Sequence, residues 1–328
     1  MLDSSPRIIA IGGSAGAVDA VKALCGSLSP ELAAAVCIVI HVGARGLNVL
    51  ANIFDNACPF PVRTAEDGER LEPGRAYVAP ADRHLLVMDG AIRLGHGPRE
   101  NLARPAIDPL FRSVGLSYGP KAIGVVLTGM LNDGPSGLAD LKRCGGVTVV
   151  QNPADAAADE MPLEALRSTD VDYRAPASEL GALIERLVRE PAGPPRPCPD
   201  GVRLEVEIAL GRPIGTDDIA QLGEPTTLTC PECGGVLTEL RRSSPLRFRC
   251  QVGHAFTGEA LNEHEETALG EAMQVALRIV EERATLTDNM ARQAHRTGMR
   301  LSATDLDARA AEARKHALVL REAIRKYG

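Results

Sequence analysis

Three residues whose side chains could form a catalytic triad each follow a short apolar run. Ser14 lies in Gly12-Gly13-Ser14-Ala15-Gly16, the G-x-S-x-G pattern of a nucleophile on a sharp strand-to-helix turn. His41 ends the run AVCIVIH, and Asp133 follows the run AIGVVLTG. A hydroxyl, an imidazole and a carboxylate brought together can open an ester: the serine attacks, the histidine moves the proton and the aspartate orients the imidazole.

A dinucleotide- or phosphate-binding turn is the competing interpretation of the glycine-rich segment, and would make the chain an oxidoreductase. Its pattern would be G-x-G-x-x-G, but position 14 is serine. The end of the second apolar run, where a ribose-binding acid belongs, carries His41 instead. Both observations favour the triad, which uses no catalytic cofactor.

A second group of reactive side chains lies near the C-terminus. Cys230 and Cys233 are followed, after 16 intervening residues, by Cys250 and His254. Three thiolates and an imidazole complete a tetrahedral zinc shell with no open position for water, so we expect a structural Zn²⁺. Reduced thiols without metal, or a redox pair at Cys230 and Cys233, are the alternatives.

The elements that position the triad follow from the apolar pattern of residues 7–189. Segments 7–13, 35–41, 122–129 and 146–151 are nearly continuous apolar runs, and stretches of helical spacing separate them. Strands that are apolar on both faces predict a doubly wound parallel α/β sheet, Rossmann-like, with helices on both sides. In such a sheet the carboxyl ends of the strands share one crevice, which would bring Ser14, His41 and Asp133 together.

The rest of the chain divides by composition. Segments 75–80, 84–90 and 91–95, with the pair Asp89-Gly90, predict a β-hairpin or small antiparallel insertion. A proline-rich stretch cannot form a regular element and predicts a linker. The expected domains are a catalytic domain at 1–189, the linker at 190–201, a small zinc-ribbon-like module at 202–256 and a helical hairpin or coiled-coil tail at 257–328.

The tail carries apolar residues at alternating spacings of four and three from Leu306 to Tyr327, and a similar stripe upstream. Gly298 interrupts the pattern, and Ser302 with Asp305 predicts the cap of a second helix. The stripe predicts packing within the chain, or else a homodimer or another partner.

Composition excludes several classes of protein. The net charge of −7 argues against a nucleic-acid partner, and no stretch approaches the roughly 20 apolar residues of a membrane helix. The N-terminus does not resemble a signal peptide, so we expect a cytoplasmic protein without membrane insertion. The separate cysteines Cys25, Cys37, Cys58 and Cys144 are expected to be buried free thiols.

Residues 7–189 resemble the catalytic domain of chemotaxis protein-glutamate methylesterases, the CheB family. The similarity rests on six blocks in the same order. They are IGGSAG (11–16), the strand ending in His41, EDGERLEPGRAYVAPADRH (66–84), ARPAIDPLFRS (103–113), VVLTGMLNDG (125–134) and QNPADAAADEMP (151–162).

The resemblance implies a hydrolase of glutamyl methyl esters on cytoplasmic helices of chemoreceptors, with glutamine deamidation as a further activity. It also implies that Met130 lines the site, so that its N–H and that of Ala15 are candidate oxyanion donors. The family usually has threonine at Ala15, glycine at Leu131 and an N-terminal receiver domain. Ala15 and Leu131 leave one alternative open, a catalytically weak esterase-fold scaffold that recruits signalling partners through the zinc module and the helical tail, although the intact triad argues against it. His84 is expected to be a structural, hydrogen-bonding histidine, with substrate contact as the alternative. Arg104 is expected either to orient a carboxylate or receptor helix, or to form a surface salt bridge.

Overall fold

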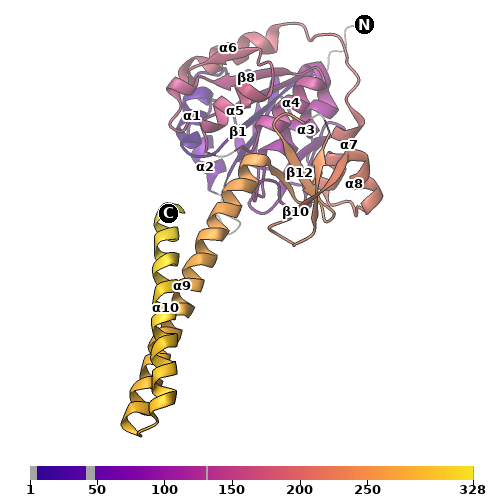
Figure 1. Cartoon of the computed structure of the whole chain (residues 1–328). Coiled ribbons are helices and arrows are strands. Elements are labelled where there is room, and N and C mark those ends of the chain that lie inside the picture. Colours follow the sequence, from indigo (N-terminus) through magenta and orange to yellow (C-terminus); the bar gives the residue numbers. More distant parts are fainter. Residues whose placement is uncertain (1–5, 42–48, 131, 242, 328) are drawn as a thin grey trace. The chain divides into compact units, whose positions relative to one another are not determined.

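A parallel sheet flanked by helices forms the centre of the catalytic region (Figure 1). It has seven strands in the order β3-β4-β2-β1-β7-β8-β9. Its strands are β1 (Arg7–Gly13), β2 (Ala34–Ile40), β3 (Val62–Thr64), β4 (Arg75–Val78), β7 (Ala122–Val126), β8 (Val147–Gln151) and β9 (Tyr173–Ala175). Every residue of β1 and β2 is buried, as expected for strands covered on both faces. The predicted doubly wound fold is therefore confirmed.

The computed structural model describes residues 6–41, 49–130, 132–241 and 243–327. It divides into two units, Met1–Ala260 and Leu261–Gly328, which we describe separately. The first unit contains both the parallel sheet and the region of the Cys/His group. The predicted domain boundaries at 189, 201 and 256 stay predictions.

Helices cover the two faces of the sheet in separate layers. One face packs against α1 (Ala17–Cys25), α2 (Leu50–Asp55) and α6 (Ala177–Arg189). The other packs against α3 (Ile107–Tyr118), α4 (Pro135–Arg143) and α5 (Glu160–Ser168). Two short 3₁₀ turns, η1 (Gly119–Lys121) and η2 (Pro153–Asp155), complete this part of the chain.

The predicted antiparallel insertion is correct for two of its three segments. Strands β5 (His84–Met88) and β6 (Ala91–Gly95) form a hairpin whose turn is Asp89-Gly90, both with positive φ. The prediction for the third segment, residues 75–80, is wrong, because β4 pairs in parallel with β2 and β3 in the main sheet. Its four residues are too few for the sequence to distinguish a central strand from a hairpin strand.

The proline-rich stretch contains no helix or strand from residue 190 to 199. A disulfide joins Cys198 of this stretch to Cys144, the residue after α4. The prediction of a free thiol at Cys144 is therefore wrong. The two cysteines are 54 positions apart, a separation that gives no local sequence signal. Cys25 and Cys37 are buried free thiols, and Cys58 is a half-buried one.

A module of two helices and a four-stranded antiparallel sheet follows the linker. Its elements are α7 (Asp200–Leu210), α8 (Thr216–Leu222), β10 (Gly223–Thr229), β11 (Val236–Leu240), β12 (Arg247–Cys250) and β13 (Ala255–Thr257). Val206 and Ala209 of α7 pack on Leu86 of β5, so the module is joined to the catalytic region by a buried apolar contact.

The second unit is a pair of long helices, α9 (Gly258–Arg296) and α10 (Arg300–Tyr327). Their junction contains Gly298, which has a φ of 76°. The predicted helical hairpin is confirmed, but the predicted cap is wrong, since Ser302 and Asp305 lie inside α10. No helix in the described ranges is long and apolar enough to cross a bilayer.

Candidate active site

The three predicted triad residues follow strands at the centre of the sheet. Strand β1 pairs with β2 on one side and with β7 on the other, and the strand order changes direction between β1 and β7. Ser14 directly follows β1, and His41 directly follows β2, with its N–H 3.4 Å from the Gly13 oxygen. This is the topological switch point at which doubly wound sheets hold their ligands.

The turn that carries Ser14 depends on small residues and on Thr128. Gly16 caps α1 with a φ of 76°, a left-handed conformation that favours glycine. A Cβ at Gly129 would lie 2.6 Å from Met161 Cε and 3.1 Å from Ser14 Cβ, so glycine leaves room here for both side chains. The Ser14 N–H donates to the Thr128 carbonyl at 3.0 Å, and Thr128 Oγ1 lies 2.9 Å from the Ala15 oxygen. Sequence reasoning did not identify Thr128.

His41 and Asp133 form a hydrogen-bonded pair. His41 Nε2 lies 2.6 Å from Asp133 Oδ2, and the His41 side chain is 19% exposed whereas Asp133 is fully buried. A carboxylate only accepts, so Nε2 carries the proton and Nδ1 is left as the basic nitrogen.

Asp133 lies against the N-terminus of α3, where backbone N–H groups lack partners within the helix. It accepts the N–H of Ile107 at 2.5 Å and that of Asp108 at 3.2 Å. The side-chain amide of Asn101 donates to Asp133 Oδ1 at 3.3 Å. These donors, together with the helix dipole, stabilise an ionised carboxylate at this place.

The expected oxyanion donors are two backbone N–H groups near Ser14. Within the described residues, the N–H groups of Ala15 and Met130 have no hydrogen-bond partner, whereas the neighbouring Ser14 and Gly129 N–H groups are bonded. No hydrogen bond joins Ser14 Oγ to the His41 ring in that part of the chain. Leu131, which departs from the family pattern, lies outside the described residues.

A second buried carboxylate, Asp108, supports the loop that carries Asp133. Its Oδ1 accepts the N–H groups of Gly134 at 2.9 Å and Gly137 at 2.6 Å. Burial, together with the nearby Asp133 carboxylate, raises the pKa of Asp108 to about 7. Asp108 belongs to the block ARPAIDPLFRS, but no sequence pattern indicates its role.

His84 and Arg104 have structural contacts. His84 is fully buried, donates from Nε2 to the Pro98 oxygen at 3.0 Å and accepts the Ala106 N–H, and burial lowers its pKa. Its predicted structural role is confirmed. Arg104 binds Asp82 through two nitrogens and donates to the Gly97 oxygen at 2.8 Å, so its guanidinium is already engaged within the chain.

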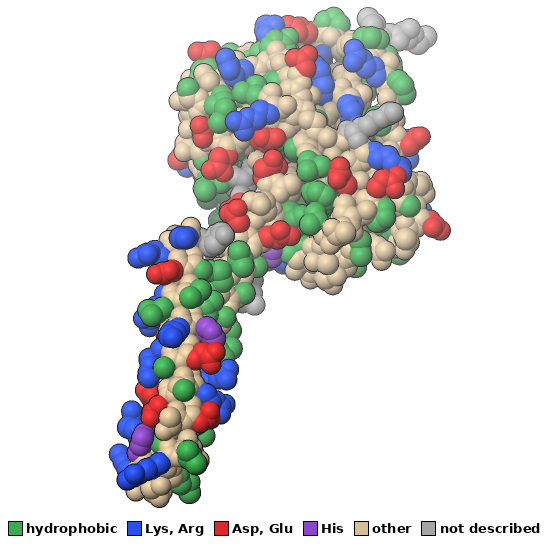
Figure 2. Space-filling view, viewed as in Figure 1, with side chains coloured by type: hydrophobic (Ala, Val, Ile, Leu, Met, Phe, Trp, Pro, Cys, Tyr) green, Lys and Arg blue, Asp and Glu red, His purple; other side chains and the backbone are tan. Residues whose placement is uncertain are grey.

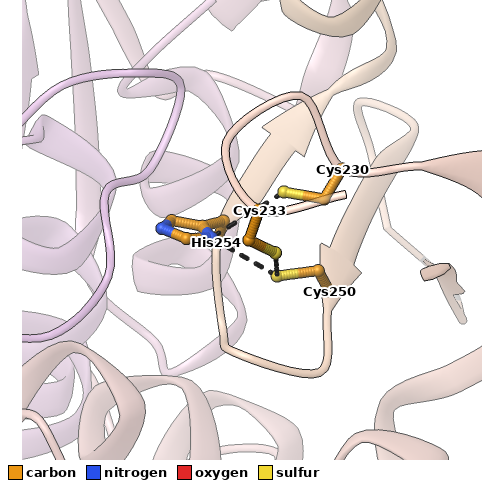
Figure 3. A group of neighbouring side chains, drawn as sticks. All are labelled: Cys230, Cys233, Cys250 and His254. Carbon is orange, nitrogen blue, oxygen red and sulfur yellow. Dashed lines mark hydrogen bonds between the residues drawn. The ribbon is translucent and has the colours of Figure 1, made fainter. Parts of the chain in front are cut away.

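Cys230, Cys233, Cys250 and His254 converge as a group that can hold a metal ion (Figure 3). Their ligand atoms all lie within 4.8 Å of one another. The Cys233–Cys250 sulfur separation is 3.7 Å, and His254 Nδ1 lies 3.5 Å from Cys250 Sγ and 3.7 Å from Cys230 Sγ. Ordinary zinc–sulfur and zinc–nitrogen bonds predict tetrahedral edges of about 3.8 and 3.6 Å, so the spacing fits such an ion.

The surroundings of this group also suit metal binding. Burial lowers the pKa of His254, so this residue presents a neutral imidazole. His254 Nε2 faces the Glu232 carboxylate at 3.7 Å, the direction in which a metal-bound histidine commonly finds an outer carboxylate.

Doubly wound α/β proteins with a serine, a histidine and a buried aspartate at the switch point are the class that this fold and geometry define. The family model described as CheB methylesterase matches residues 9–184, more than half of the chain. The chain belongs to this family.

Relatives and a solved structure agree with the family assignment. A protein-glutamate methylesterase/protein-glutamine glutaminase of Yersinia pestis bv. Antiqua (strain Antiqua) is 40% identical over 191 residues, 57% of this chain and 54% of that protein. A relative from Leptospira interrogans is 38% identical over 180 residues, 55% of this chain and 93% of the relative. The crystal structure of the Thermotoga maritima CheB methylesterase catalytic domain has a TM-score of 0.54 and 29% identity, and covers 56% of this chain and 99% of that domain. The chain spans about half the length of the Yersinia protein.

Proposed function

We propose that this chain is a protein-glutamate methylesterase that hydrolyses glutamyl methyl esters of chemoreceptor-type signalling proteins and releases methanol. The observation that carries the proposal is the 2.6 Å pair of His41 and Asp133 beside the Ser14 turn, at the switch point of the sheet. The names of the relatives also include protein-glutamine glutaminase, so deamidation of protein glutamine is part of the proposal. Since the receptor helices that the family modifies are cytoplasmic, we place the protein in the cytoplasm.

The mechanism follows from the positions of three side chains. Ser14 Oγ attacks the ester carbonyl while His41 Nδ1 takes its proton. The Ala15 and Met130 N–H groups stabilise the negative oxygen of the tetrahedral intermediate. His41 then returns the proton to the departing methoxide, and a water molecule, deprotonated by the same nitrogen, releases the glutamate. Asp133 holds the imidazole in the required tautomer and stabilises its charged form.

Methanol release from methylated receptor fragments tests this proposal with the full chain. We expect release by the native chain and by Ser29→Ala, a control at a serine beyond the other end of α1, but only background release by Ser14→Ala. Equal release by the native chain and Ser14→Ala would refute the triad. Absence of release by the native chain would favour the scaffold alternative.

We propose further that Cys230, Cys233, Cys250 and His254 hold one structural Zn²⁺. Four protein ligands leave no position for substrate, so the ion would stabilise the small module and take no part in the ester chemistry. We expect about one equivalent of zinc in the purified chain and in Cys58→Ala, and a large loss in Cys233→Ser. A purified native chain that contains no metal and takes up none from added ZnCl₂ would overturn the proposal.

We also propose that the helix pair binds a second copy of the chain. Hydrophobic side chains lie on its surface between charged groups (Figure 2), and they include Val275, Ile279, Leu286 and Met290 of α9.

A further inference from the structure

The edge of the C-terminal sheet pairs with the loop that precedes α3. The Asn101 N–H donates to the Ala255 oxygen at 2.8 Å, and the Ala255 N–H donates to the Arg99 oxygen at 3.2 Å. Ala255 begins β13. The backbone of the module therefore holds the backbone of the catalytic region at this loop.

The Asn101 side chain extends this contact to the predicted triad. Its Oδ1 accepts the Thr257 N–H at 2.9 Å, and its Nδ2 donates to Asp133 Oδ1 at 3.3 Å and to Asp108 Oδ2 at 3.4 Å. Because a backbone N–H requires an acceptor, the Thr257 contact fixes which end of the amide faces the carboxylates. Asn101 is 7% exposed and has a φ of 50°, a conformation that asparagine tolerates better than most residues.

The same strand is tied to the metal-binding group. His254 directly precedes β13, and its carbonyl accepts the Cys250 N–H at 2.9 Å. The Arg249 guanidinium donates to the Gly253 oxygen at 2.7 Å and to Glu100 Oε1 at 2.9 Å. Glu100, the neighbour of Asn101, also binds Arg112 of α3. The turn that carries Cys250 and His254 is thus joined to the loop of Asn101 in two ways. One is the backbone pairing of Ala255 with that loop, and the other is the ion pair of Arg249 with Glu100.

These contacts lie partly outside the region that defines the family. The family model ends at residue 184, whereas β12 and β13 begin at residues 247 and 255. We infer that Asn101 is a positioning residue through which the C-terminal metal module sets the orientation of Asp133 against His41. The inference rests on the proposed esterase activity and on the proposed metal site, and extends both.

In this arrangement a metal ion fixes His254 and the strand that follows it. Strand β13 then fixes Asn101 through hydrogen bonds. The Asn101 amide in turn keeps the Asp133 carboxylate in the orientation in which it accepts the hydrogen bond of His41 Nε2. Loss of the amide leaves the Asp133 side chain less constrained. We expect the proton transfer through His41 to slow and substrate binding to stay unchanged, because the Asn101 side chain bonds to Asp133 and Asp108 and, among the described residues, to neither Ser14 nor His41.

Replacement of Asn101 by glycine tests the link without straining the backbone. Glycine adopts the positive φ freely, so Asn101→Gly removes the amide and retains the turn. We expect kcat to fall about tenfold with KM unchanged, since hydrogen bonds to charged groups have this order of effect. Leu102→Gly is the matched control, because Leu102 also has a positive φ (63°) and its side chain is exposed. We expect this variant to keep the kcat of the native chain. An unchanged kcat in Asn101→Gly, or an equal fall in Leu102→Gly, would overturn the inference.

A double substitution separates positioning from a general loss of stability. If Asn101 acts through Asp133, then Asn101→Gly should lower kcat about tenfold in the native background and hardly at all in Asp133→Asn. The same tenfold fall in both backgrounds would show that Asn101 acts elsewhere, and would contradict the inference.

The link between the metal ion and Asp133 is tested on the full chain, from which a chelator first removes the metal and to which ZnCl₂ is then added back. We expect hydrogen exchange to quicken on stripping at the Thr257, Ile107 and Asp108 amides, which bond to Asn101 or Asp133, and to slow again on reloading. We also expect kcat to fall on stripping in the native chain but not in Asn101→Gly. Unchanged exchange at Ile107 and Asp108 would overturn the link to the metal.

The two readouts distinguish this inference from the esterase proposal. A native chain without ester hydrolysis would refute the proposed function, and the exchange measurement would still decide whether the module is coupled to Asp133. An active chain that is insensitive to Asn101→Gly would refute the inference alone.

Discussion

The hydrogen bonds that Asp133 accepts fix the orientation of its carboxylate beside His41. The carboxylate accepts from His41, from the first two amides of α3 and from Asn101, and it is fully buried. A buried carboxylate that accepts from several directions is held in one orientation, and it determines which nitrogen of His41 keeps the proton. Its contribution is therefore geometric as well as electrostatic.

Asparagine at position 133 should preserve the shape of the site and remove its chemistry. An amide can donate to Nε2, which would place the proton on Nδ1 and remove the base that Ser14 needs. We expect Asp133→Asn to lower kcat by about four orders of magnitude, the loss typical of a triad with the wrong tautomer. Methanol release measures this, with Asp19→Asn on the exposed surface of α1 as control. A loss of less than tenfold would contradict the role of Asp133.

At this scale the sequence could identify residues that follow recognisable strands, but not those positioned by distant contacts. Ser14, His41 and Asp133 each follow an apolar run, and parallel strands bring such ends together. Asn101 follows no strand, and its partners Ala255 and Thr257 are more than 150 positions away. Only the docked module gives Asn101 a role, so no local pattern could predict it.

Between elements, a buried cluster of charges joins the module to the catalytic region. Arg112 of α3, Glu205 of α7 and Arg247 and Arg249 of β12 are all nearly or fully buried. Glu205 Oε2 lies 2.7 Å from Arg249 and 3.4 Å from Arg112, and it also pairs with Arg247. Such a cluster is stable only while every member has its partners.

Removal of the Glu205 charge should therefore destabilise the docked elements. Glu205→Gln leaves three buried guanidinium groups short of a partner, and we expect it to lower the free energy of unfolding by about 3 to 5 kcal/mol. Urea denaturation at pH 7 measures this loss. Glu207→Gln, on the same helix and paired with the half-exposed Arg212, should cost less than about 1 kcal/mol. Equal losses in the two variants would contradict the role given to the cluster.

The cluster also predicts how stability depends on pH. Burial opposes the ionisation of Glu205, but Arg247, Arg112 and Arg249 outweigh it and lower its pKa from 4.5 to about 2. A lowered pKa in the folded state stabilises the fold above pH 4.5, and this contribution disappears as the pH falls towards 2. At about 1.4 kcal/mol for each pKa unit, it amounts to roughly 3 kcal/mol.

The comparison with Glu205→Gln isolates this contribution from that of the other carboxylates. Urea titrations at pH 7, 5 and 3 should show that the native chain loses about half of this contribution between pH 5 and pH 3, because the remainder disappears only as the pH falls towards 2. A constant difference between the two chains across this range would be inconsistent with the lowered pKa.

The elements were predictable where their length and apolar pattern were distinctive. Strand β1 and the run that became β2 were recognisable because every residue faces a covered surface. Strand β4 was assigned to the wrong sheet, and α7 was hidden inside the expected zinc module. Its Val206 and Ala209 become core residues only through contact with β5, which the sequence of either segment does not reveal.

For the molecule as a whole, the helix pair has two distinct apolar surfaces. The inner one is a seam of small residues, including Ala284 and Ala291 of α9 and Ala310 and Ala317 of α10, all nearly or fully buried. Ion pairs reinforce it across the pair, with Arg314 2.6 Å from Asp288 and His295 2.8 Å from Asp307. The predicted apolar stripe therefore packs between the two helices of the same chain, which is the first of the two interpretations that the sequence allowed.

The outer surface is the one that predicts self-association. Val275, Ile279, Leu286 and Met290 are separated by four, seven and four residues, so they share one face of α9 away from the seam. Each is about half exposed or more. Because a second helix pair offers the same stripe, two copies related by a two-fold axis can cover both at once.

We therefore expect the full chain to sediment at twice its mass of 34.7 kDa at micromolar concentration. Replacing Ile279 and Leu286 together by glutamate should yield a monomer with unchanged helical circular dichroism, because both side chains point away from the seam. Leu301→Glu, at a residue 91% exposed in α10, is the matched control and should leave the dimer intact. A native chain that sediments as a monomer at 50 µM would exclude a second copy as the partner. Dissociation by Leu301→Glu would instead place the contact near the junction of the two helices, away from the α9 stripe.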